Sequence, residues 1–517
     1  SGRGDSGIVT IWRHQPVRPM VIGFAWAVFA ICSVTPLVFL AGSAISASAP
    51  YSDLVLDARQ RRLLVNTAAL GIGTAVLATA IGTPLGILLA RAGLHRRALL
   101  RFGLTIPLLL PPYLVALAWI YAAPWVQSTA GAIVVLGLAF YPLSMLATEV
   151  AIRRTDGRLD EAASLVASPG RVLWRITLPL AAPGILAAGL VIFVLAVSEF
   201  GVPGLLQVRV YTTEVFTAFA ALYDPVRATI LTVPLLALSV FVAAISAVLL
   251  GDRLVTSRRR TATTAPQLPV SPLAATAVCA VIIGVSVAFP VFVLIGEAAG
   301  ARAGRDVLAG STTAIRNSLA VAGIGSTVVV GVAVWLGYAR ARAASWLGRV
   351  ADVVFVTLFA VPSTVLGVGL IGLWNRPGAP GFLYGTDTMF VLAVLGRFLP
   401  VAALILAAIA RFVPVSHEEA AAVSGASWLR NIGRIVLPQM RPGIVATWLM
   451  VFVLAFGELG VSILVAPPGE ATLPIRIYTL IANSPPSQVA LLALLQISVI
   501  TVPLAILLAT GARLETP

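Results

Sequence analysis

Long apolar runs recur twelve times in this chain of 517 residues and constrain its fold more than any other feature. A helix needs about 20 mostly apolar residues to cross the hydrocarbon core of a bilayer. The composition agrees, because 59% of the residues are hydrophobic and 11% are charged, against roughly 25% charged in soluble domains. We therefore predict an all-α polytopic membrane protein with about 12 transmembrane helices. The runs lie at 20–46, 64–90, 99–123, 130–150, 181–206, 229–250, 272–296, 317–339, 350–374, 388–411, 442–466 and 489–510.

The basic residues exclude two classes of function. All 35 are arginine, and nearly all are spread over the short loops and tails outside the apolar runs. They therefore do not form the single patch of a nucleic-acid-binding protein. A P-loop needs a lysine to reach the nucleotide phosphates, and the chain has none. We therefore expect no enzyme and no cofactor in this chain, so that any ATP is hydrolysed elsewhere. We also expect no metal site, because Cys32 and Cys279 are isolated in separate apolar runs.

The arginine distribution also predicts the orientation. Cytoplasmic loops of membrane proteins are enriched in basic residues. With both termini in the cytoplasm, 24 arginines lie on the inner side, 10 lie outside and Arg397 falls within a run. This orientation places two polar segments, 161–179 and 419–438, in the cytoplasm.

Similar pieces of sequence occur in the same order in two halves of the chain. Six apolar runs separate each piece from its copy, so both halves have the same topology, and we predict two parallel six-helix repeats. The expected parts are a tail (1–19), a first half (20–250), a cytoplasmic linker (251–271) and a second half (272–517). Besides the polar segments, the matches are Asn66-Thr67 with Asn317-Ser318, IFVLAVSEFGV (192–202) with VFVLAFGELGV (451–461), and Arg209-x-Tyr211-Thr with Arg476-x-Tyr478-Thr.

The second polar segment, EAAAVSGASWLRNIGRIVLP, predicts two short helices outside the bilayer. Gly425 allows a sharp turn after the first, and Ser427 can cap the second, which runs from Trp428 to Val436 and stops at Pro438. No nucleophile and base are paired in it, so we expect a mechanical role as a docking surface. The alternative is an amphipathic helix lying on lipid headgroups.

At these segments the chain resembles the membrane permeases of bacterial ATP-binding-cassette (ABC) importers. Their cytoplasmic EAA motif is matched at full spacing in the second segment. The first segment has Ala167 in place of the glycine and is one residue shorter. The resemblance implies that these residues dock an ATPase: Glu161, Ala162, Ala163, Ala167 and Pro179 in the first segment, and Glu419, Ala420, Ala421, Gly425 and Pro438 in the second.

The resemblance also implies a location and partners. These are the bacterial cytoplasmic (inner) membrane, two copies of a cytoplasmic ATP-binding subunit that holds ATP and Mg²⁺, and an extracytoplasmic solute-binding protein. The fused halves resemble the ferric-iron permeases most, with thiamine, aminoethylphosphonate, polyamine and molybdate or sulfate permeases as alternatives. An ion-coupled secondary transporter, which can also have two six-helix halves, is the rival of another class.

Three charged residues within apolar runs are candidates for the translocation path. Glu199 and Glu458 occupy matching positions, and a carboxylate within a span usually faces a cavity or a partner. Packing between helices through a hydrogen bond, for instance to Arg397, is the structural alternative. Arg397 has Ala139 as its counterpart and is either a path residue or an ion-pair partner.

The outer loops carry the repeated Arg-x-Tyr-Thr, with Arg209, Tyr211, Arg476 and Tyr478. We expect these residues either to face the solute-binding protein or to anchor the protein at the membrane interface through their tyrosines.

Overall fold

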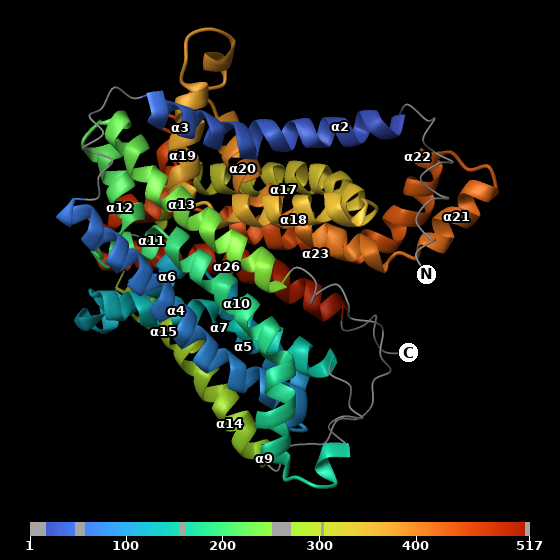
Figure 1. Cartoon of the computed structure of the whole chain (residues 1–517). Helices are drawn as coiled ribbons and strands as arrows, with labels where there is room; N and C mark the ends of the chain where they lie inside the picture. Colours follow the sequence, from blue (N-terminus) through green and yellow to red (C-terminus); the bar gives the residue numbers. More distant parts are fainter. Residues whose placement is uncertain (1–16, 47–56, 155–161, 251–269, 301–303, 512–517) are drawn as a thin grey trace. The chain divides into compact units, whose positions relative to one another are not determined.

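The computed structural model describes residues 17–46, 57–154, 162–250, 270–300 and 304–511. Helices joined by turns and short connections make up these ranges, which contain no strand (Figure 1). The chain forms two compact units, one comprising residues 1–47 and 312–474 and the other residues 48–311 and 475–517. The predicted linker falls almost wholly outside the described residues, so its boundaries stay a prediction.

The first unit combines the first helix of the chain with helices of the second sequence half. Its helices are α2 (Val17–Phe29), η1 (Ala30–Val34), α3 (Thr35–Ser46), α17 (Thr312–Ala341), α18 (Ser345–Ala360), α19 (Ser363–Trp374), η8 (Ala379–Phe382), α20 (Thr388–Phe412), α21 (Val415–Val423), α22 (Trp428–Asn431), η9 (Ile432–Val436), α23 (Leu437–Phe456) and α24 (Ser462–Val465). The first helix packs closely on α20, since a Cβ placed on Gly396 would lie 2.6 Å from the carbonyl oxygen of Cys32.

The second unit combines most of the first sequence half with the helices that begin and end the second half. Its helices are α4 (Ala58–Arg91), α5 (Arg97–Thr105), η3 (Ile106–Leu108), α6 (Pro112–Ala122), η4 (Pro124–Val126), α7 (Thr129–Arg154), α9 (Pro169–Val172), η5 (Leu173–Thr177), α10 (Leu178–Ser198), α11 (Gly201–Leu205), α12 (Tyr211–Phe216), η6 (Thr217–Ala221), α13 (Pro225–Leu250), α14 (Pro272–Ile283), η7 (Gly284–Ala288), α15 (Phe289–Ala298), α16 (Gly304–Ala309) and α26 (Pro486–Gly511). Helix α25 (Leu473–Ile481) begins in the first unit and continues in the second.

The helices confirm the predicted fold class. Within the described ranges, nine helices are long and apolar enough to span a membrane. Two pairs of helices, 97–122 and 346–374, are long and apolar enough when each pair is counted as one span, and Pro486–Thr501 in α26 is a shorter apolar stretch. The runs at 99–123 and 350–374 are not single straight helices, because their pairs are bent by 86° and 95°. The bends fall at Pro111 and Pro362, where the residue before a proline is pushed out of the helical conformation and the proline has no N–H to donate.

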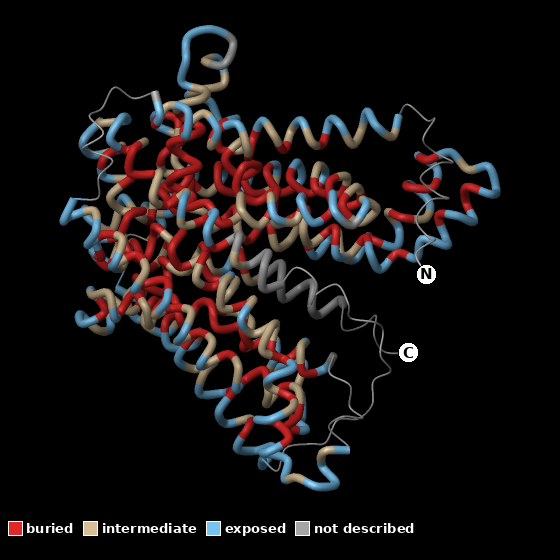
Figure 2. The backbone as a smooth tube through the Cα atoms, viewed as in Figure 1, coloured by how far each residue is buried: buried red, intermediate tan, exposed pale blue. Residues whose placement is uncertain are grey.

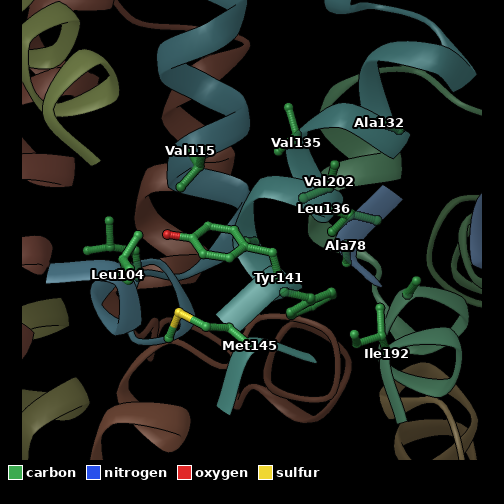
Figure 3. Close-up of a cluster of buried hydrophobic side chains, with 14 of the residues drawn as sticks. Ala78, Leu104, Val115, Ala132, Val135, Leu136, Tyr141, Met145, Ile192 and Val202 are labelled. Atoms are coloured by element: carbon green, nitrogen blue, oxygen red, sulfur yellow. The ribbon is translucent and has the colours of Figure 1, made fainter. Parts of the chain in front are cut away.

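Residues of the spans separate into a buried interior and an exposed exterior (Figure 2). In the second unit the ring of Tyr141 lies among Leu104, Val115 and Met145 in a buried cluster (Figure 3). On the outside, Met20, Phe24 and Phe292 are about 70% exposed, which suits contact with lipid chains as apolar as themselves.

Candidate functional site: the two polar elbows

The second polar segment forms a helical elbow, which we define as residues 415–438 and call the second elbow. Helix α21 ends in a Schellman turn, in which the Gly425 N–H donates to the carbonyl of Ala422 and the Ala426 N–H donates to that of Ala421, both at 3.0 Å. Gly425 has φ +75°, in the left-handed region. The Ser427 hydroxyl then accepts from the Arg430 N–H and caps α22. The structure confirms the predicted turn and cap.

A buried carboxylate holds the second elbow to a long helix of the same unit. Glu418, only 2% exposed, accepts hydrogen bonds from the Tyr338 hydroxyl at 2.8 Å and from Arg342 Nε at 2.7 Å. Asn431 Nδ2, from the other short helix of the elbow, donates to the same carboxylate at 3.2 Å. Tyr338 lies near the end of α17 and Arg342 just after it, so one carboxylate joins both short helices to α17.

An aromatic contact reinforces the same attachment. The Trp428 side chain is fully buried, with its ring centroid 5.8 Å from that of Trp335 and 6.3 Å from that of Tyr338. Figure 1 shows α21 and α22 together beyond the end of α17. The elbow is therefore a packed extension of the bundle, anchored by an ion pair and by aromatic rings.

The motif residues divide between the two faces of the second elbow. Glu419, Ala420, Gly425 and Pro438 are exposed, whereas the side chain of Ala421 is buried. The outer face also presents apolar side chains, and Val423 is 84% exposed. Leu429 on the same elbow is 51% exposed, and several exposed apolar side chains gathered into a patch are typical of a surface that another protein covers.

The first elbow, residues 162–179, turns without a left-handed residue. The Ala167 N–H donates to the Ala163 carbonyl at 3.0 Å, and Ala167 has a negative φ. Ala162 and Pro179 are exposed, Ala163 and Ala167 are half-buried, and Glu161 lies outside the described residues. Leu165 and Val166 are 86% and 85% exposed, so this elbow also presents an apolar outer surface.

Both elbows enter their long helices through a π-helical turn. The turns are η5 and η9, each ending one residue before the leucine of the Leu-Pro pair. The N–H of Leu178 donates to the Leu173 carbonyl, and that of Leu437 donates to the Ile432 carbonyl. Such single π turns are rare and often occur at functional sites. The prediction that the second short helix stops at Pro438 is wrong, because the helix that begins at Trp428 continues through η9 into α23. Nothing in the residue pattern distinguishes a π turn from α-helix.

We expect replacement of Gly425 to disturb the second elbow by backbone strain alone. A Cβ at this position would meet no atom within 4 Å, but φ +75° costs a non-glycine residue about 1–2 kcal/mol. Gly425→Val should therefore accelerate amide hydrogen exchange across residues 419–431. Ala167→Val is the matched control, since the backbone there suits a side chain. Equal exchange in the Gly425→Val variant and the unmodified protein would contradict this explanation.

Glu199 and Glu458 lie just beyond the ends of α10 and α23, before the short helices α11 and α24. Glu199 Oε1 accepts from the Gly201 N–H at 3.0 Å, and Glu458 Oε1 accepts from the Val461 N–H at 3.0 Å. Both residues are half-buried. A carboxylate at this position satisfies helix N–H groups that lack a partner within the helix. Their matching positions thus have a structural explanation, while a role in the path stays a prediction.

Arg397 lies beside the bend between α18 and α19. Its Nη1 donates to the carbonyl of Phe359 at 3.3 Å and to the carbonyl of Val361, and its guanidinium lies 5.7 Å from the centre of the Phe359 ring. These carbonyls are at the break that Pro362 introduces, where the helical hydrogen bonds stop. The residue pattern predicted an ion-pair partner or a path residue, and hydrogen bonds from Arg397 to the backbone are a third arrangement that it did not indicate.

The outer loops are held by the Asn-Thr and Asn-Ser pairs. Asn66 Nδ2 donates to the Arg209 carbonyl at 3.0 Å, and the Tyr211 N–H donates to Thr67 Oγ1 at 3.0 Å. In the other half, Asn317 Nδ2 donates to Glu470 Oε2 at 2.5 Å, and the Leu473 N–H donates to the Ser318 hydroxyl at 2.6 Å. The Asn-Thr pair in one half and the Asn-Ser pair in the other thus each hold an outer loop.

These contacts correct the alignment of Arg-x-Tyr-Thr. Tyr211 begins α12 as Leu473 begins α25, so Arg476 and Tyr478 lie inside a helix, five residues beyond the positions that match Arg209 and Tyr211. Arg209 is exposed, Arg476 and Tyr478 are half-buried, and the Tyr211 side chain is fully buried. Burial, together with the carboxylates of Asp57 and Glu214, raises the pKa of Tyr211 to about 12. The neutral, enclosed phenol packs inside the protein.

Comparison with known sequences assigns the family. Residues 82–256 and 329–514, more than half of the chain, match the model of the family described as "Binding-protein-dependent transport system inner membrane component". The chain belongs to this family, the membrane permeases of ABC importers. The two matches confirm that the chain is a fusion of two permease halves.

Individual relatives carry several substrate names. The chain is 25% identical over 437 residues to the Fe(3+)-transport system permease protein FbpB 2 of Haemophilus influenzae, covering 82% of this chain and 85% of the relative. It is 32% identical over 155 residues to the molybdenum transport system permease protein ModB of Mycobacterium bovis, covering 27% of this chain and 58% of the relative. It is 26% identical over 132 residues to a putative 2-aminoethylphosphonate permease, PhnV, of Salmonella paratyphi A, covering 25% and 48%.

Proposed function

We propose that this permease imports ferric iron, delivered by an extracytoplasmic binding protein, by alternating access. The observation that carries the proposal is the similarity to the Haemophilus influenzae ferric permease, which extends over most of both chains. The similarities to molybdenum and aminoethylphosphonate permeases cover about a quarter of this chain. Import of molybdate, sulfate, aminoethylphosphonate, thiamine or a polyamine is the alternative within the same class.

In this proposal the two elbows dock two copies of a cytoplasmic ATP-binding subunit. ATP and Mg²⁺ are held by that subunit, and the termini of the permease lie in the cytoplasm. The exposed apolar side chains on both elbows supply contact area, and the attachment of the second elbow through Glu418 would pass its movement to α17. ATP and the loaded binding protein must favour different conformations for such a cycle to run.

Reconstitution tests the proposal directly. The chain is purified with its ATPase subunit, inserted into liposomes and supplied with the loaded binding protein and radiolabelled Fe(III). We expect uptake that requires both ATP and the binding protein, and co-purification of the ATPase. A thermal-shift screen of the binding protein with Fe(III), molybdate, aminoethylphosphonate, thiamine and spermidine separates the alternatives. Proton-driven uptake by the permease alone would support a secondary transporter and overturn the proposal.

A further inference from the structure

A cavity of about 720 Å³ lies in the second unit, at the end of the unit opposite the first elbow. It is formed where α4 begins, where α10 has ended, and by α11, α12 and Tyr478 of α25 (Figure 1). The first elbow, by contrast, lies where α10 begins. The volume falls within the range of about 300–1,000 Å³ that is typical of small-molecule sites.

Arginine dominates the charge of this cavity. Its lining includes Arg59, Arg62 and Arg209, and Glu214 is the one acidic residue that lines it. Glu214 is already paired with Arg59, with 2.7 Å between Nη2 and Oε1. Within the described part of the chain, Arg62 and Arg209 form no ion pair, and Asp57 nearby accepts the Gln60 N–H at 2.6 Å. Two guanidinium groups therefore remain available to a ligand.

One wall of the cavity is aromatic. The ring of Phe200 lies 4.7 Å from that of Phe216 and 5.9 Å from that of Tyr478, measured between centroids. Rings and guanidinium groups together suit a ligand with an anionic part and an apolar part. The polar and charged residues of the lining would fix the orientation of such a ligand.

The arginines are not part of the repeated architecture. At the spacing that relates Asn66 to Asn317, the counterparts of Arg59 and Arg62 are Gly310 and Thr313. The outer-loop contacts place Ala471 where Arg209 lies in the first half. The same helix packing thus forms in the second half without any of the three arginines, so the fold does not require them.

We infer that this cavity binds an anionic solute, a small molecule with carboxylate, phosphonate or other oxyanion groups. Guanidinium groups hold such groups through charge-assisted hydrogen bonds. The inference rests on the proposed import function and narrows its substrate class. The arginines repel bare Fe(III) and spermidine, so iron reaches this site as an anionic complex.

Binding to the purified full-length permease in phosphatidylcholine nanodiscs tests the site without the ATPase. The probes for isothermal titration are citrate, Fe(III)–citrate, inorganic phosphate, molybdate and aminoethylphosphonate, with spermidine as the cationic probe. We expect at least one anion to bind, more weakly as salt is raised. Arg62→Ala and Arg209→Ala should each weaken it about tenfold, as for a lost hydrogen bond to a charged group. Arg316→Ala, at an exposed arginine near the start of α17, should leave binding unchanged.

The outcomes separate the possible sources of the anion. An anionic headgroup that occupies the site would compete with the probe, so the unmodified protein would lose probe binding in phosphatidylglycerol nanodiscs. If Arg62→Ala then bound the probe equally in phosphatidylglycerol and phosphatidylcholine, the anion site would be supported and assigned to a lipid headgroup. Binding of no anion, equal binding of spermidine, or anion binding unaffected by both arginine variants would overturn the inference. If Arg62→Ala and Arg209→Ala bound anions normally but lost ATP hydrolysis stimulated by the binding protein, the inference would also be overturned. The arginines would then contact the binding protein and not a solute.

The test also keeps this inference apart from the proposed function. ATP-driven uptake by a permease that binds no anion would leave the import function standing without this site. Anion binding by a permease that shows no ATP-driven uptake would leave the site standing without that function.

Discussion

Glu418→Ala is expected to detach the second elbow from α17. The substitution leaves Arg342, whose side chain is 13% exposed, with the Val413 carbonyl but without its carboxylate, and it removes the acceptor of Tyr338 and Asn431. Removing one partner of a buried ion pair typically costs about 3–5 kcal/mol, because the remaining charge stays buried and unpaired. We expect a melting temperature lower by several degrees in nanodiscs, and loss of ATP-driven uptake.

The neighbouring Glu419 provides the matched control. It differs from Glu418 by one position in the same helix, but its side chain is exposed. Glu419→Ala should therefore leave the melting temperature unchanged, whatever it does to ATPase docking. Glu418→Gln, which keeps the acceptor but loses the charge, should fall between the two. If both alanine variants melted at the temperature of the unmodified protein, Glu418 would not anchor the elbow.

The second large effect is expected at Arg397, in the interior of the first unit. Arg397→Leu removes the donor to the carbonyls of Phe359 and Val361 at the bend before α19. Each buried carbonyl left without a donor costs about 1–3 kcal/mol, and water is scarce within a membrane protein. We expect faster hydrogen exchange in residues 361–366 and a lower melting temperature.

Arg376→Leu is the control for this prediction. Arg376 also donates to a backbone carbonyl, that of Gly372 at 3.1 Å, but it is exposed, so water can replace it. A change of similar size in both variants would show that loss of any arginine, and not loss of the bond at the bend, explains the result. Unchanged exchange near the bend in Arg397→Leu would show that Arg397 does not stabilise the bend.

The sequence predicted the features that depend on apolar length and local backbone preference. Apolar length located the spans, and the glycine at 425 indicated a turn that the φ value confirms. The sequence did not indicate a role for Glu418, because the EAA motif begins at Glu419. Only tertiary packing shows which of the two adjacent carboxylates is buried. Tyr338 and Arg342, spaced four residues apart at the end of an apolar run, were the available signal for a polar contact there.

Other features depend on contacts that sequence similarity does not report. The match of Arg-x-Tyr-Thr aligned Tyr211 with Tyr478, whereas the contacts show that Tyr211 corresponds to Leu473. The second outer loop is three residues longer than the first, and a four-residue resemblance does not reveal this difference. The role of Arg397 depends on the bend at Pro362, which brings free carbonyls to it from another helix. The grouping of the first helix with the second half also results from packing between segments remote in sequence.

The paired π turns determine the direction in which each elbow leaves its long helix. A π turn contains one residue more than an α turn, so residues before it are rotated by about 100° around the helix axis relative to an uninterrupted α-helix. Both halves carry this offset at the same Leu-Pro position, although the two elbows turn by different means, Gly425 in one and Ala167 in the other. The main chain thus sets the direction in which each elbow leaves its own helix, and the outward side chains are free to differ between the two elbows.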